Sequence, residues 1–143
     1  LQAMMASVLM ISIIPIYTDN LSINPLSIIG ISIAFFGLAY EAIADWQLSR
    51  FLKNNKNQVM DQGLWYHSRH PNYFGEFLVW WGIYLISFNG LYSFTILSPL
   101  LMSLLLFKVS GAELLESTIV SRRPGYEKYI QDTSMFFPWF KKK

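Results

Sequence analysis

The sequence predicts an all-α integral membrane domain, a helical bundle of about four hydrophobic segments with a polar pocket on its cytoplasmic side. Three observations lead to this fold class. Hydrophobic residues make up 53% of the 143 residues and charged residues only 14%, whereas an ordinary soluble domain carries about 25% charged residues. The hydrophobic residues gather in long runs with short polar loops between them. The cations are confined to loops that share one side of a bilayer if the runs alternate across it.

The length fits a single domain that covers residues 1–143. The chain contains no cysteine, which excludes disulfide frameworks, thiolate metal sites and thiol nucleophiles. It opens at Leu1 inside an apolar run, without an initiating Met or a basic leader, and is therefore a poor signal peptide. We expect it to be the C-terminal part of a longer protein.

Four hydrophobic runs approach the length of membrane helices, since about 20 apolar residues cross the hydrocarbon core. They cover residues 1–17, 26–44, 73–88 and 94–109. The helical pattern of the second run continues through residues 45–51. The third run is short, which leaves a tilted, re-entrant or partly buried helix open. Pro71 predicts a break before it, because the residue before a proline avoids the α region, and Pro99 predicts a kink in the fourth run.

The segments between the runs have the composition of loops. Residues 18–25 contain Asp, Asn and Pro, and Asn89-Gly90 predicts a tight turn. Residues 53–62 are polar and rich in amides, as in an interfacial loop. In the tail, a Pro124-Gly125 turn can fold Tyr126 and Tyr129 back over residues 63–76.

The distribution of cations predicts the topology. If the four runs alternate, all eleven Lys and Arg residues lie on one side, and the loops at 18–25 and 89–93 carry none. The positive-inside rule places that side in the cytoplasm, including the 53–74 loop and the C-terminal tail. The eleven cations are Arg50, Lys53, Lys56, Arg69, Lys108, Arg122, Arg123, Lys128, Lys141, Lys142 and Lys143.

Residues 63–76, GLWYHSRHPNYFGE, combine aromatic, basic, amide and acidic side chains between two apolar runs. Polar groups beside hydrocarbon persist mainly where they have a partner or a function. Simpler interpretations exist for parts of the pattern. The aromatic residues can be interfacial anchors, and Lys141–Lys143 can contact anionic lipid or act as a topology signal. Asp45 can be solvated at a helix end, whereas Glu41, one turn deeper, needs a partner.

Metal and nucleotide sites of the common kinds are not predicted. His67 and His70 could bind a metal with Asp61 or Glu76, but Pro71 disturbs the helix there and the chain has no third histidine. No Gly-rich nucleotide fingerprint occurs. Nucleic-acid binding has no support beyond the basic tail.

The residue types of the pocket suit a large anionic cofactor. Arginine binds phosphate in a bidentate fork, and Arg69, Arg122 and Arg123 lie near the pocket together with the basic residues after the second run. An asparagine side chain complements a primary carboxamide such as that of nicotinamide. Trp65 and Tyr126 can stack on an adenine.

The central stretch resembles the C-terminal signature of the steroid 5α-reductase-like membrane proteins, and above all their bacterial DUF1295 branch. The resemblance extends from about Ala39 to the C-terminus. It rests on Gly63-Leu64-Trp65, Ser68-Arg69-His70-Pro71-Asn72-Tyr73, Gly75-Glu76, Glu41, Asp45-Trp46-Gln47, Glu113, Glu116, Arg122-Arg123, Tyr126, Tyr129 and Phe137-Pro138. Reductases of this kind bind NADPH and reduce a carbon–carbon double bond in a lipid. The resemblance therefore implies an NADPH-dependent reductase in the inner membrane of a bacterium.

The resemblance also implies roles for individual residues. Trp65, Asn72 and Tyr73 would line the cofactor site, Glu116 takes the place of an acidic cofactor contact, and Tyr129 takes that of the closing tyrosine. Arg50 and Lys53 lie near the basic pair that holds phosphate in sterol reductases, at a different spacing. The full set of expected cofactor contacts is Arg50, Lys53, Trp65, Arg69, His70, Asn72, Tyr73, Glu76, Glu116, Arg123, Tyr126 and Tyr129.

Two alternatives stay open at this point. Isoprenylcysteine carboxyl methyltransferases have a similar motif but bind S-adenosylmethionine, and they usually lack the equivalents of Asn72 and Glu76. A membrane protein that retains a cofactor without catalysis is the third hypothesis. For a reductase, the helices that carry the proton donor would precede Leu1, so no catalytic residue is assigned. The substrate is expected to be steroid-like or another lipid, and the oligomeric state is not predicted.

Overall fold

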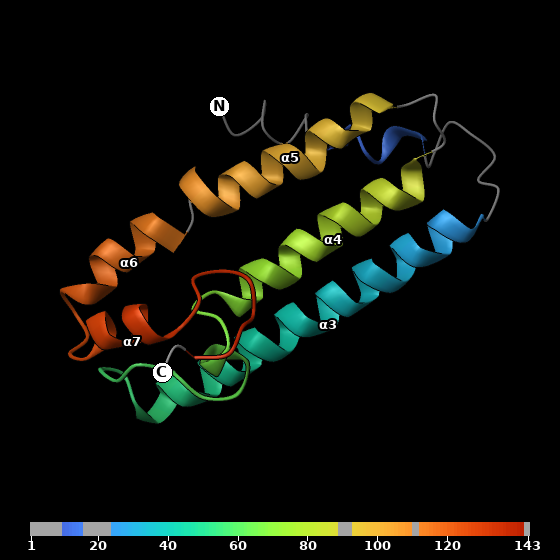
Figure 1. Ribbon diagram of the computed structural model, residues 1–143. Helices are drawn as coiled ribbons and strands as arrows, with labels where there is room; N and C mark the ends of the chain where they lie inside the picture. The colour runs from blue at the N-terminus through green and yellow to red at the C-terminus, as the bar shows by residue number, and fades with distance from the viewer. Residues whose placement is uncertain (1–9, 16–23, 89–92, 110–111, 142–143) are drawn as a thin grey trace.

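The computed structural model describes residues 10–15, 24–88, 93–109 and 112–141, without the side chains of residues 93, 108–109 and 112–115. These residues form helices and loops, with no strand among them, which confirms the all-α prediction. Two long antiparallel helices lie side by side, and a third helical layer covers one of them (Figure 1). The predicted turn at Asn89-Gly90 and most of the first hydrophobic run lie outside the described residues.

Helix α3 (Pro25–Asn54) is the longest element, and its ends follow from the sequence. Asn24 caps its first turn by accepting a hydrogen bond from the Ser27 backbone, and the Ser27 hydroxyl binds back to Asn24, which forms a capping box. Pro25 occupies the first helical position, where its missing N–H costs nothing. The helix carries exposed apolar side chains such as Ile28, Phe35 and Ile43. The second hydrophobic run and its continuation are thus one helix, as predicted.

Helix α4 (Pro71–Ser87) begins at the predicted break and packs antiparallel against α3. The two backbones touch at glycines. A Cβ atom at Gly37 would lie 2.6 Å from the Gly75 carbonyl oxygen, and one at Gly82 would lie 2.6 Å from the Ala34 nitrogen. Small residues that permit such close approach are typical of helix pairs in membranes.

The fourth hydrophobic run is helical but not one regular helix. It consists of a 3₁₀ turn, η2 (Ser93–Ile96), helix α5 (Leu97–Leu104) and a π-helical turn, η3 (Leu105–Val109). Pro99 lies in the first turn of α5, where a proline need not kink the helix, and a change from 3₁₀ to α-helix precedes it. The described part of the first run docks here, since the Ser12 hydroxyl donates a hydrogen bond of 2.9 Å to the Thr95 carbonyl.

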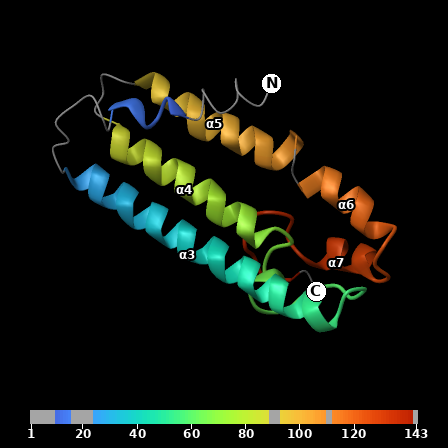
Figure 2. The ribbon, with the colours of Figure 1, turned by 180° about the vertical axis from the view of Figure 1, so that it is seen from behind.

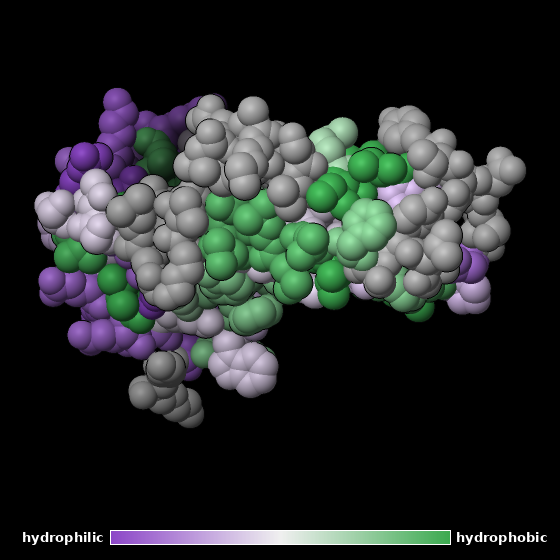
Figure 3. Space-filling view, turned by 90° about the horizontal axis from the view of Figure 1, so that it is seen from above, coloured by the Kyte–Doolittle hydropathy of each residue, from purple (hydrophilic) through white to green (hydrophobic). Residues whose placement is uncertain are grey.

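Two short helices complete the chain at one end of the molecule. Helix α6 (Ala112–Val120) is followed by a turn in which Gly125 adopts a φ of 86°, a conformation that favours glycine. Helix α7 (Tyr126–Asp132) then leads into the tail, residues 133–141, which returns to the first turns of α4 (Figure 2). Hydrophilic residues gather at this end, and hydrophobic residues cover the middle of the molecule (Figure 3).

The structure supports membrane insertion for one helix. Within the described residues, only α3 is both long and apolar enough to cross a bilayer. Helix α4 has 17 residues, about 26 Å at 1.5 Å per residue, which is less than the ~30 Å of the hydrocarbon core. The fourth run is divided among three helix types. The predicted four-span topology is therefore not established by the fold.

Candidate functional site

The stretch between α3 and α4 is fixed to α3 by two hydrogen bonds. It contains the 3₁₀ turn η1 (Gly63–Tyr66), which Gly63 enters with a φ of 60°. The Leu64 backbone donates to Gln47 Oε1 at 3.0 Å. The indole of Trp65 donates to the Ala44 carbonyl, also at 3.0 Å. Trp65 is thereby buried against the last third of α3.

The tail pairs with residues 67–69 in antiparallel order. Arg69 N donates to Ser134 O at 2.9 Å, the Ser68 hydroxyl donates to Phe136 O at 2.8 Å, and Trp139 N donates to His67 O at 2.9 Å. His67 Nδ1 also lies 3.3 Å from Trp139 O. Two segments almost seventy residues apart in the chain thus share one hydrogen-bonded seam, which we call the seam below.

A buried ion pair lies under the seam. Arg69 binds Glu116 in bidentate fashion, with Nε 2.7 Å from Oε1 and Nη2 3.2 Å from Oε2. Arg69 Nη1 donates to the carbonyls of Ile130 and Thr133, and His70 Nε2 donates to Glu116 Oε1 at 3.0 Å. Burial opposes ionisation of Glu116, but the His70 hydrogen bond and the Arg69 guanidinium outweigh it and lower the pKa of this carboxyl below its usual value.

Two tyrosines of α7 close the arrangement. The Tyr129 hydroxyl donates to the carbonyls of Trp65 and Ser68, which folds α7 back onto residues 63–76. The Tyr126 ring packs edge-on against Tyr129, with 5.6 Å between ring centroids. Burial, followed by the nearby Glu116 charge, raises the pKa of Tyr126 to about 12, and burial raises that of Tyr129 as well. Both hydroxyls are therefore neutral at physiological pH.

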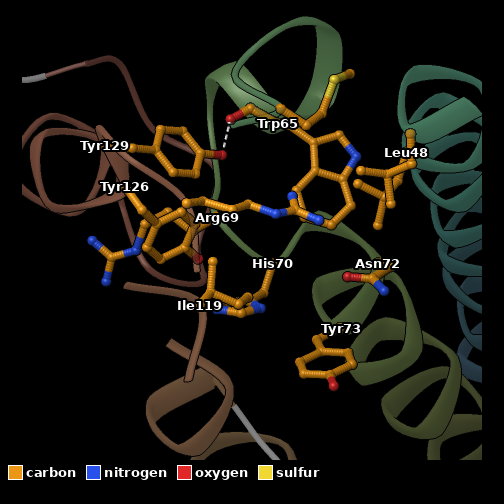
Figure 4. A pocket seen from close by; sticks show the side chains of 12 residues that line it. Leu48, Trp65, Arg69, His70, Asn72, Tyr73, Ile119, Tyr126 and Tyr129 are labelled. Atoms are coloured by element: carbon orange, nitrogen blue, oxygen red, sulfur yellow. Dashed lines mark hydrogen bonds between the residues drawn. The ribbon is translucent and has the colours of Figure 1, made fainter. Parts of the chain in front are cut away.

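A cavity of about 230 Å³ opens between α3, the start of α4 and the α6–α7 unit (Figure 4). Eight of the twelve predicted cofactor contacts line it: Trp65, Arg69, His70, Asn72, Tyr73, Arg123, Tyr126 and Tyr129. Four apolar lining residues were not predicted: Leu48, Leu52, Met60 and Ile119. The sequence contained an indication for Leu48 and Leu52. Together with Ala44 they recur every four residues on one face of α3, beyond its apolar run.

Asn72 is a lining residue with a buried side-chain oxygen that lacks a hydrogen-bond partner among the described residues. Its Nδ2 donates to Asp45 Oδ1 at 3.1 Å, and since a carboxylate only accepts, this contact orients the amide. Its Oδ1 is buried and has no hydrogen-bond partner among the described residues. Figure 4 shows this oxygen on the cavity side of the amide. A buried acceptor of this kind requires an explanation, and a ligand donor in the cavity would supply one.

The remaining predicted contacts lie outside this cavity. Arg50 lines a second hollow of about 360 Å³ with Trp46, Gln47, Phe51, Met60, Gln62 and Gly63, and its guanidinium lies 5.4 Å from the Trp46 ring centroid. Met60 belongs to both cavities. Lys53 is in the last turn of α3. Glu116 binds Arg69 and His70 and is not among the residues that line the cavity.

The acidic residues of the helix pair form a separate group. Glu76 of α4 interacts electrostatically with Glu41 and Asp45 of α3. Glu76 is not among the residues that line the cavity. The side chain of Glu113 lies outside the described residues. The described residues contain no group of three His, Cys, Asp or Glu side chains arranged to hold a metal ion.

The loops with many cations meet at this end of the molecule. Arg123 Nη1 donates to the Gln58 carbonyl at 3.3 Å, and Lys141 lies 3.5 Å from Asp61. The 53–62 loop and the tail thus lie on the same side of the fold, as the distribution of cations predicts.

Comparison with known proteins agrees with the motif. No curated protein and no solved structure matches the chain. The sequence matches the family described as a protein of unknown function, DUF1295, over residues 1–133, which include every cavity-lining residue as well as the Arg69–Glu116 pair. With almost its whole length covered by that match, the chain belongs to the DUF1295 family.

Proposed function

We propose that the chain forms the cofactor-binding part of a membrane reductase that uses NADPH to reduce an activated carbon–carbon double bond in a steroid-like or other lipid. The observation that carries the proposal is the unpaired Asn72 Oδ1 beside the cavity. One amide N–H is held by Asp45, so the oxygen is available to accept a hydrogen bond from the carboxamide of a nicotinamide ring.

The aromatic and apolar lining supports a planar ligand ring. Trp65 forms one wall and Tyr73 another, with the His70 ring stacked on Tyr73 at a centroid distance of 5.4 Å. Leu48, Leu52 and Met60 exclude water from the other side. A mostly apolar cavity with a few convergent polar groups is the usual form of a cofactor site.

The two cavities together support a ligand with two separate parts. The first, at about 230 Å³, is smaller than the ~300–1,000 Å³ of typical ligand pockets. The second adjoins it through Met60 and offers Arg50. Four of the five N–H groups of Arg69 are already bound to Glu116, Ile130 and Thr133, so Arg69 holds the wall. Arg50 and Arg123 are the arginines that we assign to phosphate.

The chain's own part in the reaction is to bind, to orient and to keep water out. Bound NADPH would supply a hydride from C4 of its nicotinamide. Asn72 fixes the orientation of the ring through the carboxamide, and Trp65 limits its movement. The seam and the Arg69–Glu116 pair keep α7 over the cavity. We assign the acceptor lipid to the bilayer side and the cation-rich end to the cytoplasm, in the inner membrane of a bacterium, with α3 as one of four spans.

A methyltransferase that uses S-adenosylmethionine is the second candidate. The volume of the first cavity favours it, because S-adenosylmethionine is much smaller than a dinucleotide. Its amino group can also donate a hydrogen bond to Asn72 Oδ1. The two candidates share the cavity and differ in the second hollow, which a dinucleotide needs and S-adenosylmethionine does not.

Titration of the purified protein with NADPH and with S-adenosylmethionine, by calorimetry in detergent micelles, tests the proposal. We expect NADPH to bind, and Asn72→Ala to weaken it by about 1–3 kcal/mol, the cost of one buried hydrogen bond. Asn57→Ala, in the exposed 53–62 loop, is the matched control and leaves binding unchanged. Binding of S-adenosylmethionine alone would favour the second candidate, and binding of neither cofactor would refute both candidates.

A further inference from the structure

The tail presents apolar side chains to the outside while its backbone is held in place. Phe136 is buried, but Phe137, Trp139 and Phe140 are 54%, 70% and 76% exposed. Large aromatic side chains with this exposure are unusual at a protein surface and mark an interaction site when they cluster. In this tail three of them occur within four residues.

The backbone contacts show that this exposure belongs to the folded tail. Trp139 N and O both contact His67, and the Ser68 hydroxyl binds Phe136 O. The Phe137 ring also packs edge-on against Phe74 and Phe77 of α4, at 5.9 and 6.0 Å. Lys141 is held over the Tyr66 ring at 4.6 Å from the centroid. The exposed rings are therefore carried on a fixed support.

The position of the tail along α3 identifies the surroundings of these rings. Trp65 is bonded to Ala44 and Leu64 to Gln47, and His67, two residues after Trp65, is bonded to Trp139. On α3 the exposed large hydrophobic residues run from Ile28 to Ile43 and end at Trp46, and the polar residues Asp45, Gln47 and Arg50 begin in the same turns. The tail thus lies at the level where α3 changes from apolar to polar, which in a membrane helix is the boundary between hydrocarbon and headgroups.

The chemistry of the tail selects one partner. Tryptophan and phenylalanine favour the interfacial region of a bilayer, and three lysines at positions 141–143 follow them directly. Basic residues beside interfacial aromatics attract anionic lipid headgroups. We propose that residues 137–141 form an interfacial anchor, in which Trp139 and Phe140 enter the headgroup region of an anionic membrane surface, to which the positive charge of the C-terminal lysine run attracts the tail. This assignment does not depend on which cofactor the cavity binds.

The absence of cysteine from the chain allows a direct test by site-directed spin labelling. Phe140→Cys is labelled with a nitroxide in the full chain, reconstituted in vesicles that contain phosphatidylglycerol. The accessibility of the label to oxygen and to a water-soluble nickel complex then reports its depth. Phe35→Cys, on the exposed apolar face of α3, is the membrane reference, and Lys56→Cys, in the polar loop, is the aqueous reference.

We expect the ratio of oxygen to nickel accessibility at position 140 to be severalfold higher than at position 56 and closer to that at position 35. Trp139→Cys gives a second, independent position with the same expectation. In vesicles of phosphatidylcholine alone, or after Lys142→Gln and Lys143→Gln, the ratio at position 140 falls. A label as accessible to nickel as that at position 56 would overturn the anchor. A label protected from both reagents would do so too, because it would indicate a protein partner. Equal ratios in anionic and neutral vesicles would overturn the selection of anionic lipid.

Discussion

The helix pair α3–α4 and the seam beside it are held together in opposite ways. Between the helices the backbones themselves touch, at Gly30, Gly37, Gly75 and Gly82, and no side chain fits between them. At the seam the elements are joined through main-chain hydrogen bonds and one buried ion pair. The helix pair depends on the lack of side chains, and the seam depends on particular side chains.

The difference follows from the surroundings of each region. The helix pair lies between apolar surfaces, where close van der Waals contact is the main source of affinity. The seam lies at the end where hydrophilic residues gather (Figure 3), and its backbone groups are outside regular structure. Buried groups of that kind need explicit partners. Each region therefore has a characteristic substitution that should break it.

The largest effect is expected at the ion pair. Arg69→Ala leaves Glu116 buried without its main partner and removes the donors to two carbonyls, so we expect a loss of about 3–5 kcal/mol in the free energy of unfolding. Denaturant or thermal unfolding in micelles measures it. Arg122→Ala, an exposed arginine, is the control, and a similar loss in both variants would refute the structural role of the pair.

A smaller effect is expected in the helix pair. Gly37→Val places a branched side chain against the Gly75 carbonyl, and overpacking of this kind costs about 1–3 kcal/mol. Ala42→Val, on the exposed side of α3, is the control. Wild-type stability in Gly37→Val would contradict the close approach.

Acid should weaken the seam but not the glycine contacts. Because the pKa of Glu116 is lowered in the folded protein, the contribution of this carboxylate is complete above its ordinary value of 4.5 and is lost as the pH falls through the folded value. Unfolding measured from neutral pH down to about pH 3 should show a steeper loss in the wild type than in Glu116→Gln. Parallel curves would assign the acid sensitivity to other carboxylates.

The smallest effect is expected at Tyr129. Tyr129→Phe removes one hydroxyl that binds the Trp65 and Ser68 carbonyls, which should cost about 0.5–1.5 kcal/mol. Tyr66→Phe removes a hydroxyl from a ring that is 42% exposed and serves as control. The midpoint of thermal unfolding should be lower for Tyr129→Phe than for Tyr66→Phe. Identical midpoints would show that water replaces the Tyr129 hydroxyl without loss of stability.

The sequence was sufficient for the local features of the fold. The apolar run after the 18–25 loop predicted the start of α3 to within one residue, and Pro71 predicted the start of α4, because a proline acts on the residues beside it. The Pro124-Gly125 turn also predicted that α7 folds back. The length of each run did not determine whether it spans a bilayer, since the fourth run is divided by a 3₁₀ and a π-helical turn.

The sequence could not separate the roles of the polar residues. Arg69 and Arg123 both looked like phosphate contacts, but Arg69 is occupied by Glu116, 47 positions away. Nothing local indicates that pairing, and it depends on where α6 lies. For the same reason, the sequence indicated only that Met60 belongs to a polar loop, although it lines two cavities. The assignment of a ligand to these residues stays a prediction.

The antiparallel seam also has a consequence for biosynthesis. Helices α3 and α4 adjoin in the chain and can associate as soon as both have left the ribosome. The seam needs Ser134, Phe136 and Trp139, which are synthesised more than sixty residues after the segment that they bind. The seam can therefore form only after the helix pair has been synthesised. A chain that stops before residue 134 would contain every residue that lines the cavity but none of the tail residues that form the seam.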